Sequence, residues 1–347
     1  MAAVTRTAPP LAPRLARGDF VRAPLLANAR PDGYKEWYHF LVHQAGWRLL
    51  VNLSLTAGAD GRLIPRVIVL AEDQRWDGVL QRFDPAELDV SPDLGALVIG
   101  RNRMTVGAGG YHLVVDLPDR DIHGELWLAP TDPRYVQITN QPAGSGRMNW
   151  LFVPRLSATG RFRIGGREHR LDAAAAYHDH NWGRFRWGDD FGWEWGSVLC
   201  GGPDRPCSLV FMRMTDRSRL RTLSQALYVC RPDAPPLLFR DAELRVRGSG
   251  LLGGEPDCTL PPPMRLLLGG GAADVPASLE VTARRRGDSV TAVVQPGSFA
   301  RVAYPSEVDL DRAAVLCEAA GPATVRGVLA GEEIGGDGDG VFEMCHG

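Results

Sequence analysis

The stretch Trp47–Leu55 (WRLLVNLSL) shows which kind of secondary structure dominates this chain. Every second position is apolar, namely Trp47, Leu49, Val51, Leu53 and Leu55, and Arg48, Asn52 and Ser54 share the opposite face. A period of two is typical of a strand that buries one face in a core. Tyr111–Leu117 repeats the pattern, so we expect half-buried antiparallel strands in both places.

Turn-forming residues separate further short runs of this kind. Gly165-Gly166 and the run Gly335–Gly340 are predicted turns, and strand and turn alternate at spacings of about ten residues. Arg161–Leu171 (RFRIGGREHRL) predicts one complete hairpin around its two glycines. Helical periodicity is weak, and Leu310–Ala319 is the best candidate for a short helix. The sequence therefore predicts an all-β protein built as sandwiches or up-and-down barrels.

The length of 347 residues is sufficient for two ordinary domains. We place their boundary between residues 175 and 200, which gives an N-terminal β domain of residues 19–180 and a C-terminal β domain of residues 181–347. Residues 1–18 contain Pro and Arg but no apolar core of the length that a signal peptide needs, so we expect a flexible segment there.

The composition excludes several classes of partner. The formal net charge is −2, and the chain has no basic block or basic stripe interleaved with aromatic residues. Nucleic acid is therefore not expected as a partner. No run approaches the roughly 18 apolar residues of a membrane span. Because the six cysteines include no Cys-x-x-Cys pair and no signal peptide is recognised, we expect reduced thiols and a cytoplasmic location, while the oligomeric state stays open.

The segment Ala173–Leu199 contains an unusual concentration of aromatic side chains. Four of the nine tryptophans fall within fourteen residues of it, namely Trp182, Trp187, Trp193 and Trp195. Aromatic rings bury a large apolar area and attract cations, so they suit a pocket in which an apolar substrate develops positive charge. If the preceding stretch is extended, its side chains alternate between two faces, with His178, His180 and Trp182 on one and Tyr177, Asp179 and Asn181 on the other.

An acid in such an aromatic wall can serve as a proton donor. Desolvation would raise the pKa of Asp179 or Glu194 and keep a proton on the carboxyl. The alternative is structural: the Trp and Asn side chains pack in a bend between domains, and His178 and Asp179 tie down backbone. Glu36–Phe40 (EWYHF) is a second aromatic segment that could close against the first, with an edge strand as its alternative interpretation.

A metal site is the main competing interpretation of the histidines. His178-x-His180 offers two ligands on one strand face, as cupins do, but Arg184 and Phe185 stand where a cupin places Glu. No further histidine follows until His346, so we predict no metal site. Because no phosphate-binding glycine motif and no Gly-x-Ser-x-Gly elbow occurs, we also predict no cofactor and no serine nucleophile.

Taken together and in order, the motifs resemble the carotenoid 1,2-hydratase (hydroxyneurosporene synthase) and AttH superfamily. The resemblance covers roughly residues 30–345, and its most specific motif is Tyr177–Gly183 (YHDHNWG). The other matching elements are Glu36-Trp37-Tyr38-x-Phe40, a hairpin containing Pro154-x-Leu156 and Gly160, Trp193-x-Trp195, and the C-terminal Glu318, Gly327 and Gly340–Glu343.

The resemblance implies two lipocalin-like (calycin) antiparallel β-barrel or sandwich domains, with the ligand pocket at or near their junction. The superfamily includes hydratases and cofactor-free Diels–Alderases of polyketide biosynthesis. His180 and Trp182 match positions implicated in hydratase chemistry, and Asp179 belongs to the same motif. Hydratases carry a Tyr-x-Asp pair further along, where the nearest match in this chain is Tyr228-x-Cys230. The missing carboxylate argues against hydration.

Our leading hypothesis is a cofactor-independent cyclase or isomerase, a pericyclase similar to the Diels–Alderases, that acts on an apolar polyene or polyketide intermediate in natural-product biosynthesis. A carotenoid-type hydratase and a non-catalytic carrier of a hydrophobic ligand are the alternatives. The candidate catalytic residues are Asp179, His180, Tyr177 and Glu194. The candidate substrate-binding residues are Trp37, Tyr38, His39, His178, Asn181, Trp182, Trp187, Trp193, Trp195 and Tyr228.

Overall fold

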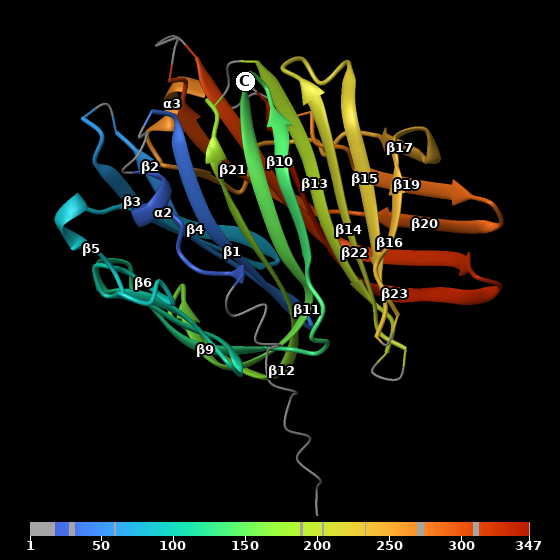
Figure 1. Cartoon of the computed structure of the whole chain (residues 1–347), viewed down its shortest axis with the longest axis horizontal. Helices are drawn as coiled ribbons and strands as arrows, with labels where there is room; N and C mark the ends of the chain where they lie inside the picture. Colours follow the sequence, from blue (N-terminus) through green and yellow to red (C-terminus); the bar gives the residue numbers. More distant parts are fainter. Residues whose placement is uncertain are drawn as a thin grey trace, which may run out of the picture.

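Two curled antiparallel sheets, each closing into a barrel-like body, make up almost all of the described chain (Figure 1). This computed structural model describes residues 18–27, 32–58, 60–187, 190–202, 205–232, 234–268, 274–307 and 312–346. The all-β, lipocalin-like prediction is confirmed. The flexible segment predicted for residues 1–18 lies outside the described residues except for Gly18.

The first sheet (blue to green in Figure 1) has twelve strands in the order β4-β3-β2-β1-β12-β11-β9-β8-β7-β6-β5, and β10 pairs with β11. A short helix, α2 (Ala23–Leu26), precedes it. Its strands are β1 (Tyr34–Gln44), β2 (Trp47–Ala57), β3 (Leu63–Asp73), β4 (Arg75–Arg82), β5 (Leu88–Val90), β6 (Ala96–Ile99), β7 (Asn102–Gly107), β8 (Gly110–Leu117), β9 (Ile122–Pro130), β10 (Val136–Ala143), β11 (Gly146–Ile164) and β12 (Arg167–Arg184).

The second sheet (yellow to red in Figure 1) has eleven strands, with the main order β16-β15-β14-β13-β23-β22-β20-β19-β17. β21 pairs with β22 and with β18, and α3 (Met264–Leu268) lies between β18 and β19. Its strands are β13 (Phe191–Cys200), β14 (Cys207–Asp216), β15 (Thr222–Cys230), β16 (Leu237–Arg240), β17 (Leu244–Ser249), β18 (Cys258–Leu260), β19 (Ser278–Arg285), β20 (Asp288–Val294), β21 (Ser298–Pro305), β22 (Ala313–Leu329) and β23 (Glu332–His346).

Three local predictions have clear outcomes. Gly165 and Gly166 join β11 to β12 with φ of 59° and 75°, the positive values that a two-residue hairpin turn needs, so the predicted hairpin is confirmed. The helix predicted at Leu310–Ala319 is wrong, because its described part enters β22, which is hydrogen-bonded on both sides by β21 and β23. The turn predicted at Gly335–Gly340 is also wrong, since those glycines lie within β23.

The strands where the two sheets meet are buried on both faces. One face of the first sheet encloses its own apolar core, and one face of the second sheet encloses another. The opposite faces of β1, β12, β13, β14, β22 and β23 pack together and form a third core between the sheets. Every residue of β13 is buried as a result. A polar side chain on these strands therefore lies either inside a barrel or between the two sheets.

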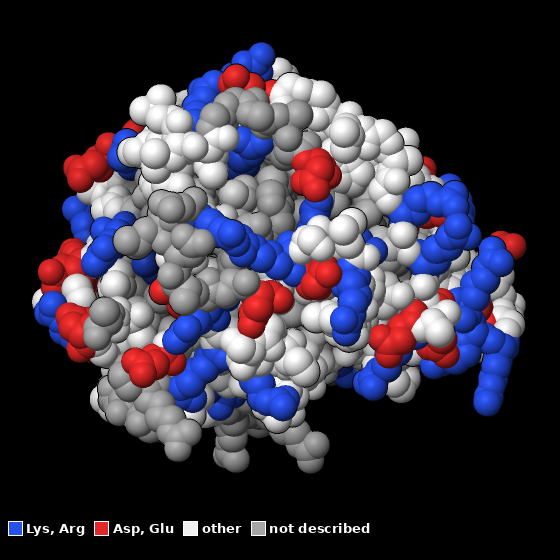
Figure 2. Space-filling view, turned by 90° about the horizontal axis from the view of Figure 1, so that it is seen from above, with Lys and Arg blue, Asp and Glu red and all other residues white. Residues whose placement is uncertain are grey.

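The surface shows no dominant charge. On the face seen in Figure 2, basic and acidic side chains are mixed over most of the area, with more basic groups toward the end of the second sheet. Among the described residues, no helix has the length and apolar character needed to cross a membrane.

Candidate active site

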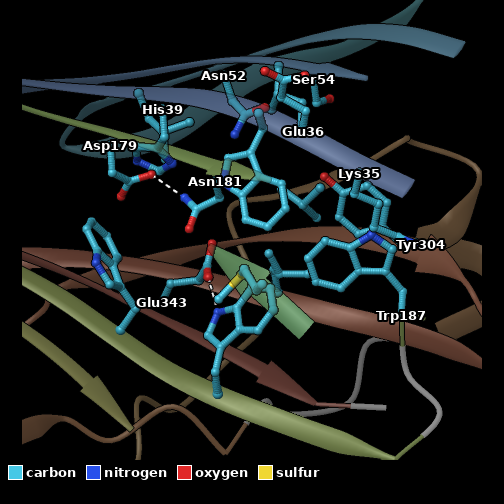
Figure 3. A pocket seen from close by; sticks show the side chains of 18 of the residues that line it. Lys35, Glu36, His39, Asn52, Ser54, Asp179, Asn181, Trp187, Tyr304 and Glu343 are labelled. Carbon is cyan, nitrogen blue, oxygen red and sulfur yellow. Dashed lines mark hydrogen bonds between the residues drawn. The ribbon is translucent and has the colours of Figure 1, made fainter. Parts of the chain in front are cut away.

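A pocket lies between the two sheets and opens to solvent (Figure 3). Strands β1, β2, β3, β11 and β12 supply one side of it, and β13, β14, β21, β22 and β23 supply the other. The space not filled by atoms is about 820 Å³, counting the open mouth. Its wall is largely apolar, and its aromatic members are Trp37, Trp150, Trp187, Trp193, Trp195 and Tyr304.

The aromatic wall is held together by ring contacts across the two sheets. The Trp187 ring stacks on Tyr304 with centroids 5.1 Å apart, and Trp37 stacks on Trp193 at 6.4 Å. Trp195 packs on His39 at 5.4 Å. Since these rings come from both sheets, the pocket exists only where the sheets meet.

Alternation along β12 divides the conspicuous motif between two environments, as the sequence predicted for an extended strand. Tyr177, Asp179 and Asn181 point toward the space between the sheets, where Asp179 and Asn181 line the pocket. Residues 178, 180 and 182 point into the first barrel instead. Tyr177 does not line the pocket but packs against Trp195, with ring centroids 5.4 Å apart.

Asp179 is a buried carboxyl with neutral hydrogen-bond donors. It is 4% exposed and accepts hydrogen bonds from the Tyr177 hydroxyl at 2.9 Å and the Asn181 amide at 2.6 Å. Burial raises its pKa from 3.8 to about 8, and the nearby Glu343 adds to the rise against the lowering effect of the Tyr177 hydrogen bond. The carboxyl is therefore protonated at neutral pH and is able to donate a proton.

His39 lies beside Asp179 as a neutral base. The two residues are register partners on β1 and β12. Burial, with a contribution from His178, lowers the pKa of His39 to about 3, so its imidazole carries no charge at neutral pH. Its Nε2 is buried without a hydrogen-bond partner, and the side chain lines the pocket. A protonated acid and a neutral base thus stand side by side in one wall.

Besides Glu36, which hydrogen-bonds His180, two further acids in the pocket lining were not among the predicted site residues. Glu318 on β22 and Glu343 on β23 are 3% and 8% exposed, and both line the pocket. The Trp193 Nε1–H donates a hydrogen bond to Glu343 (Figure 3). The sequence signal that could have identified Glu343 is a single acid on an otherwise apolar strand face, since Val341 and Cys345 flank it at alternate positions.

The two histidines of the motif form a different polar site, inside the first barrel. His178 and His180 are fully buried and hydrogen-bond the Asp19 carboxylate at 3.0 and 2.7 Å. His180 also hydrogen-bonds Glu36 at 2.9 Å. Burial lowers the pKa of His180, but Asp19 and Glu36 outweigh it and leave the pKa raised. The histidines therefore hold the segment that carries Asp19 and do not line the pocket.

Other predicted site residues also lie outside the pocket lining. Tyr38 faces the first barrel and stacks on His180 at 3.9 Å, and Trp182 packs in the same core. Glu194 forms an ion pair with Arg213 on the neighbouring strand. Tyr228 packs edge-on against the Phe152 ring at 5.2 Å. Trp37, His39, Asp179, Asn181, Trp187, Trp193 and Trp195 are the predicted residues that the fold brings together in the wall.

The single lysine of the chain also lines the pocket. Lys35 is 1% exposed, and its Nζ donates to the Phe185 carbonyl at 2.6 Å and pairs with Glu307 at 2.7 Å. Figure 3 shows it near Trp187 and Tyr304, away from Asp179. Within the part of the chain that the structure describes, no group of three or more His, Cys, Asp or Glu side chains is arranged to hold a metal ion.

Solved structures share this architecture, although comparisons of the sequence find no match. No protein-family model matches the sequence, and no curated protein matches it. Among solved structures, a putative AttH (NE1406) from Nitrosomonas europaea is similar, with a TM-score of 0.62, 14% identity, and coverage of 96% of this chain and 98% of that one. The chain has the AttH fold. The resemblance indicated by the sequence is thereby confirmed at the level of the fold.

Two other solved proteins share the fold at low identity. Kievitone hydratase from Nectria haematococca gives a TM-score of 0.57 with 11% identity, covering 98% of this chain and 96% of that one. CghA gives 0.59 with 14% identity, covering 91% and 88%, and it has also been solved with Sch210972. The fold is therefore found in a protein named as a hydratase and in one solved together with Sch210972.

Proposed function

We propose that this protein is a cofactor-independent cyclase or isomerase that acts on an apolar, polyunsaturated small molecule bound between the two sheets. The observation that carries the proposal is the protonated Asp179 in an aromatic-walled pocket. A neutral carboxylic acid can donate a hydrogen bond or a proton to a carbonyl or alkene at neutral pH, where an ionised carboxylate cannot.

The pocket wall supplies the other requirements of such a reaction. Rigid aromatic surfaces favour a folded arrangement of a flexible polyene, so that its reacting carbons start close together. The Asn181 amide and the Tyr177 hydroxyl hold Asp179 in place by their hydrogen bonds. Tyr177 is a positioning residue in this scheme, because it does not line the pocket. An apolar polyene or a polyketide intermediate fits this wall better than a highly charged metabolite.

Hydration of an alkene is the second candidate, and a specific pair of residues favours it. His39 is a neutral base next to Asp179, so Asp179 could protonate one carbon while His39 Nε2 accepts a proton from the water that adds to the other. The similarity to kievitone hydratase supports the same chemistry. In this scheme Asp179 replaces the carboxylate that is absent at Cys230.

One experiment separates these proposals. Purified protein is incubated in ¹⁸O-labelled water with polyene and polyketide intermediates extracted from the producing organism, and the products are analysed by mass spectrometry. A product of unchanged mass and altered retention supports cyclisation or isomerisation. A gain of one labelled water establishes hydration and overturns our preference. Quantitative recovery of bound but unchanged ligand would identify a carrier.

The role of Asp179 is tested in the same assay. We expect Asp179→Asn to lower kcat by at least about a hundredfold, the contribution typical of a general acid, while ligand binding is retained. Asp89→Asn, an exposed carboxyl on β5, is the matched control and keeps wild-type activity. Full activity in Asp179→Asn would refute the assignment.

A further inference from the structure

Glu318 and Glu343 form a pair of carboxyl groups in the pocket. They are directly opposite each other on β22 and β23, and their side chains hydrogen-bond each other. A hydrogen bond between two carboxyl groups requires a proton on one of them. Both side chains are more than nine-tenths buried, so the pair carries at most one negative charge before a strong repulsion sets in.

The surrounding donors indicate which member ionises first. Burial raises the pKa of Glu343, but Glu343 accepts hydrogen bonds from Trp193 Nε1 and from the Glu318 carboxyl, and both act against that rise. Burial and the neighbouring acids, Glu343 first, raise the pKa of Glu318 well above its usual range, so Glu318 holds the proton. Glu318 on β22 is thus the neutral hydrogen-bond donor of the pair. Glu343 on β23 is the acceptor, and it is the first of the two to become an anion.

The described residues provide no basic counter-ion for this anion. Among the ion pairs of the described chain, none joins Lys or Arg to Glu318, Glu343 or Asp179. Lys35 pairs with Glu307, which lies near Tyr304. Arg66 interacts electrostatically with Glu307 and Tyr304 as well. A buried carboxylate without a cation is costly, and the cost falls when a ligand supplies the positive charge.

Unpartnered polar atoms in the same wall also point to a ligand. Glu318 Oε2 and His39 Nε2 are buried without a hydrogen-bond partner on side chains that line the pocket. Figure 3 shows His39, Asp179 and Glu343 grouped at one end, with Lys35 and Tyr304 at the other. The tryptophan faces beside Glu343 add attraction for a cation.

We propose that Glu343, held by the proton of Glu318, is the counter-charge for a positive charge on an otherwise apolar ligand seated against Trp193 and Trp195. The proposal rests on the proposed function, because it states that the bound substrate becomes cationic in this part of the pocket. It assigns Asp179 as the proton donor and the Glu318–Glu343 pair as the group that stabilises the charge so formed.

Binding of a charged probe tests the proposal without turnover. Dodecyltrimethylammonium, used below its micelle concentration, is compared with the neutral dodecyl methyl ether by quenching of tryptophan fluorescence. We expect Glu343→Gln to weaken ammonium binding at least tenfold and to change ether binding less than twofold. Glu318→Gln keeps a donor toward Glu343 and retains ammonium binding within threefold. Glu333→Gln, an exposed acid on β23, removes the same formal charge and changes neither affinity.

The pH dependence of the wild-type protein gives a second measurement if Glu343→Gln does not fold. Ammonium affinity should rise relative to ether affinity as the pair ionises with increasing pH, and it should still rise in Asp179→Asn, which removes the titration of that acid. Between pH 5 and 9 His39 stays neutral, so it adds no change of its own.

The outcomes separate this proposal from the proposed function. Unchanged ammonium binding in Glu343→Gln, equal loss of both probes, or a flat pH profile would overturn the counter-charge, whatever turnover is found. Selective ammonium binding that depends on Glu343, in a protein that converts no polyene, would support the charge site and refute the enzymatic assignment.

Discussion

Replacement of Asp179 by Asn gives a direct test of the protonated state on which the proposed chemistry depends. The substitution keeps the size of the side chain and its capacity to hydrogen-bond Tyr177 and Asn181, but it removes the titratable proton. In the folded protein, burial raises the pKa of Asp179 from 3.8 to about 8. The folded state therefore retains a proton that the unfolded chain releases above its ordinary pKa.

The difference between the pKa of Asp179 in the folded and the unfolded state determines how stability changes with pH. Because the pKa in the folded state is raised, the contribution of Asp179 to stability is complete below pH 3.8 and is lost as pH rises toward about 8. Within this window the free energy of unfolding falls by about 1.4 kcal/mol per pH unit. Between pH 5 and pH 7 the wild-type protein should therefore lose about 3 kcal/mol relative to Asp179→Asn.

Urea unfolding followed by tryptophan fluorescence at pH 5, 6, 7 and 8 measures this difference. Tyr177→Phe provides a second variant, because removal of the hydroxyl that lowers the pKa of Asp179 should extend the divergence from Asp179→Asn to higher pH. Stability curves for wild type and Asp179→Asn that run parallel between pH 5 and pH 7 would mean that Asp179 is ionised in the folded protein, and the acid role would have to be abandoned.

Four further changes have defined outcomes. Asp19→Asn removes the buried acceptor of two histidines and should destabilise the fold by about 3 kcal/mol in urea unfolding, whereas pocket binding stays within twofold; a stability loss below 1 kcal/mol would contradict the ion-pair assignment. Trp195→Ala should cost about 3–5 kcal/mol and weaken binding of apolar ligands; unchanged binding in a calorimeter would remove this ring from the site. Gly338→Ala should lower the melting temperature, since its Cβ would lie 2.1 Å from the Leu199 carbonyl oxygen. Acylation of Lys35 by an amine-reactive ester should be slow in the native protein and fast in urea, as read by peptide mass spectrometry; equal rates would show that its ion pair gives no protection.

The strands and their hairpins could be predicted from the sequence because their signals are local. Period-two alternation and paired glycines depend on backbone geometry over a few residues, as the confirmed turn at Gly165-Gly166 shows. The turn predicted at Gly335–Gly340 was wrong because it, too, was inferred from local residue types alone. Gly338 lies inside β23 because the neighbouring backbone approaches too closely for a side chain, which is a constraint that only strand pairing reveals. The actual turn into β23 is at Ala330 and Gly331, with φ of 51° and 83°.

The sequence by itself determined the all-β class, the alternation that separates Asp179 from His180, and the aromatic character of the site. It could not determine which face of β12 meets the pocket, because both faces are buried and alternation looks the same from either side. Tertiary structure alone placed His180 against Asp19 and brought Glu318 and Glu343 near Asp179. Asp179 is more than a hundred residues from Glu318 and Glu343 along the chain, and only the packing of one sheet on the other brings it close to them and raises the pKa of these acids.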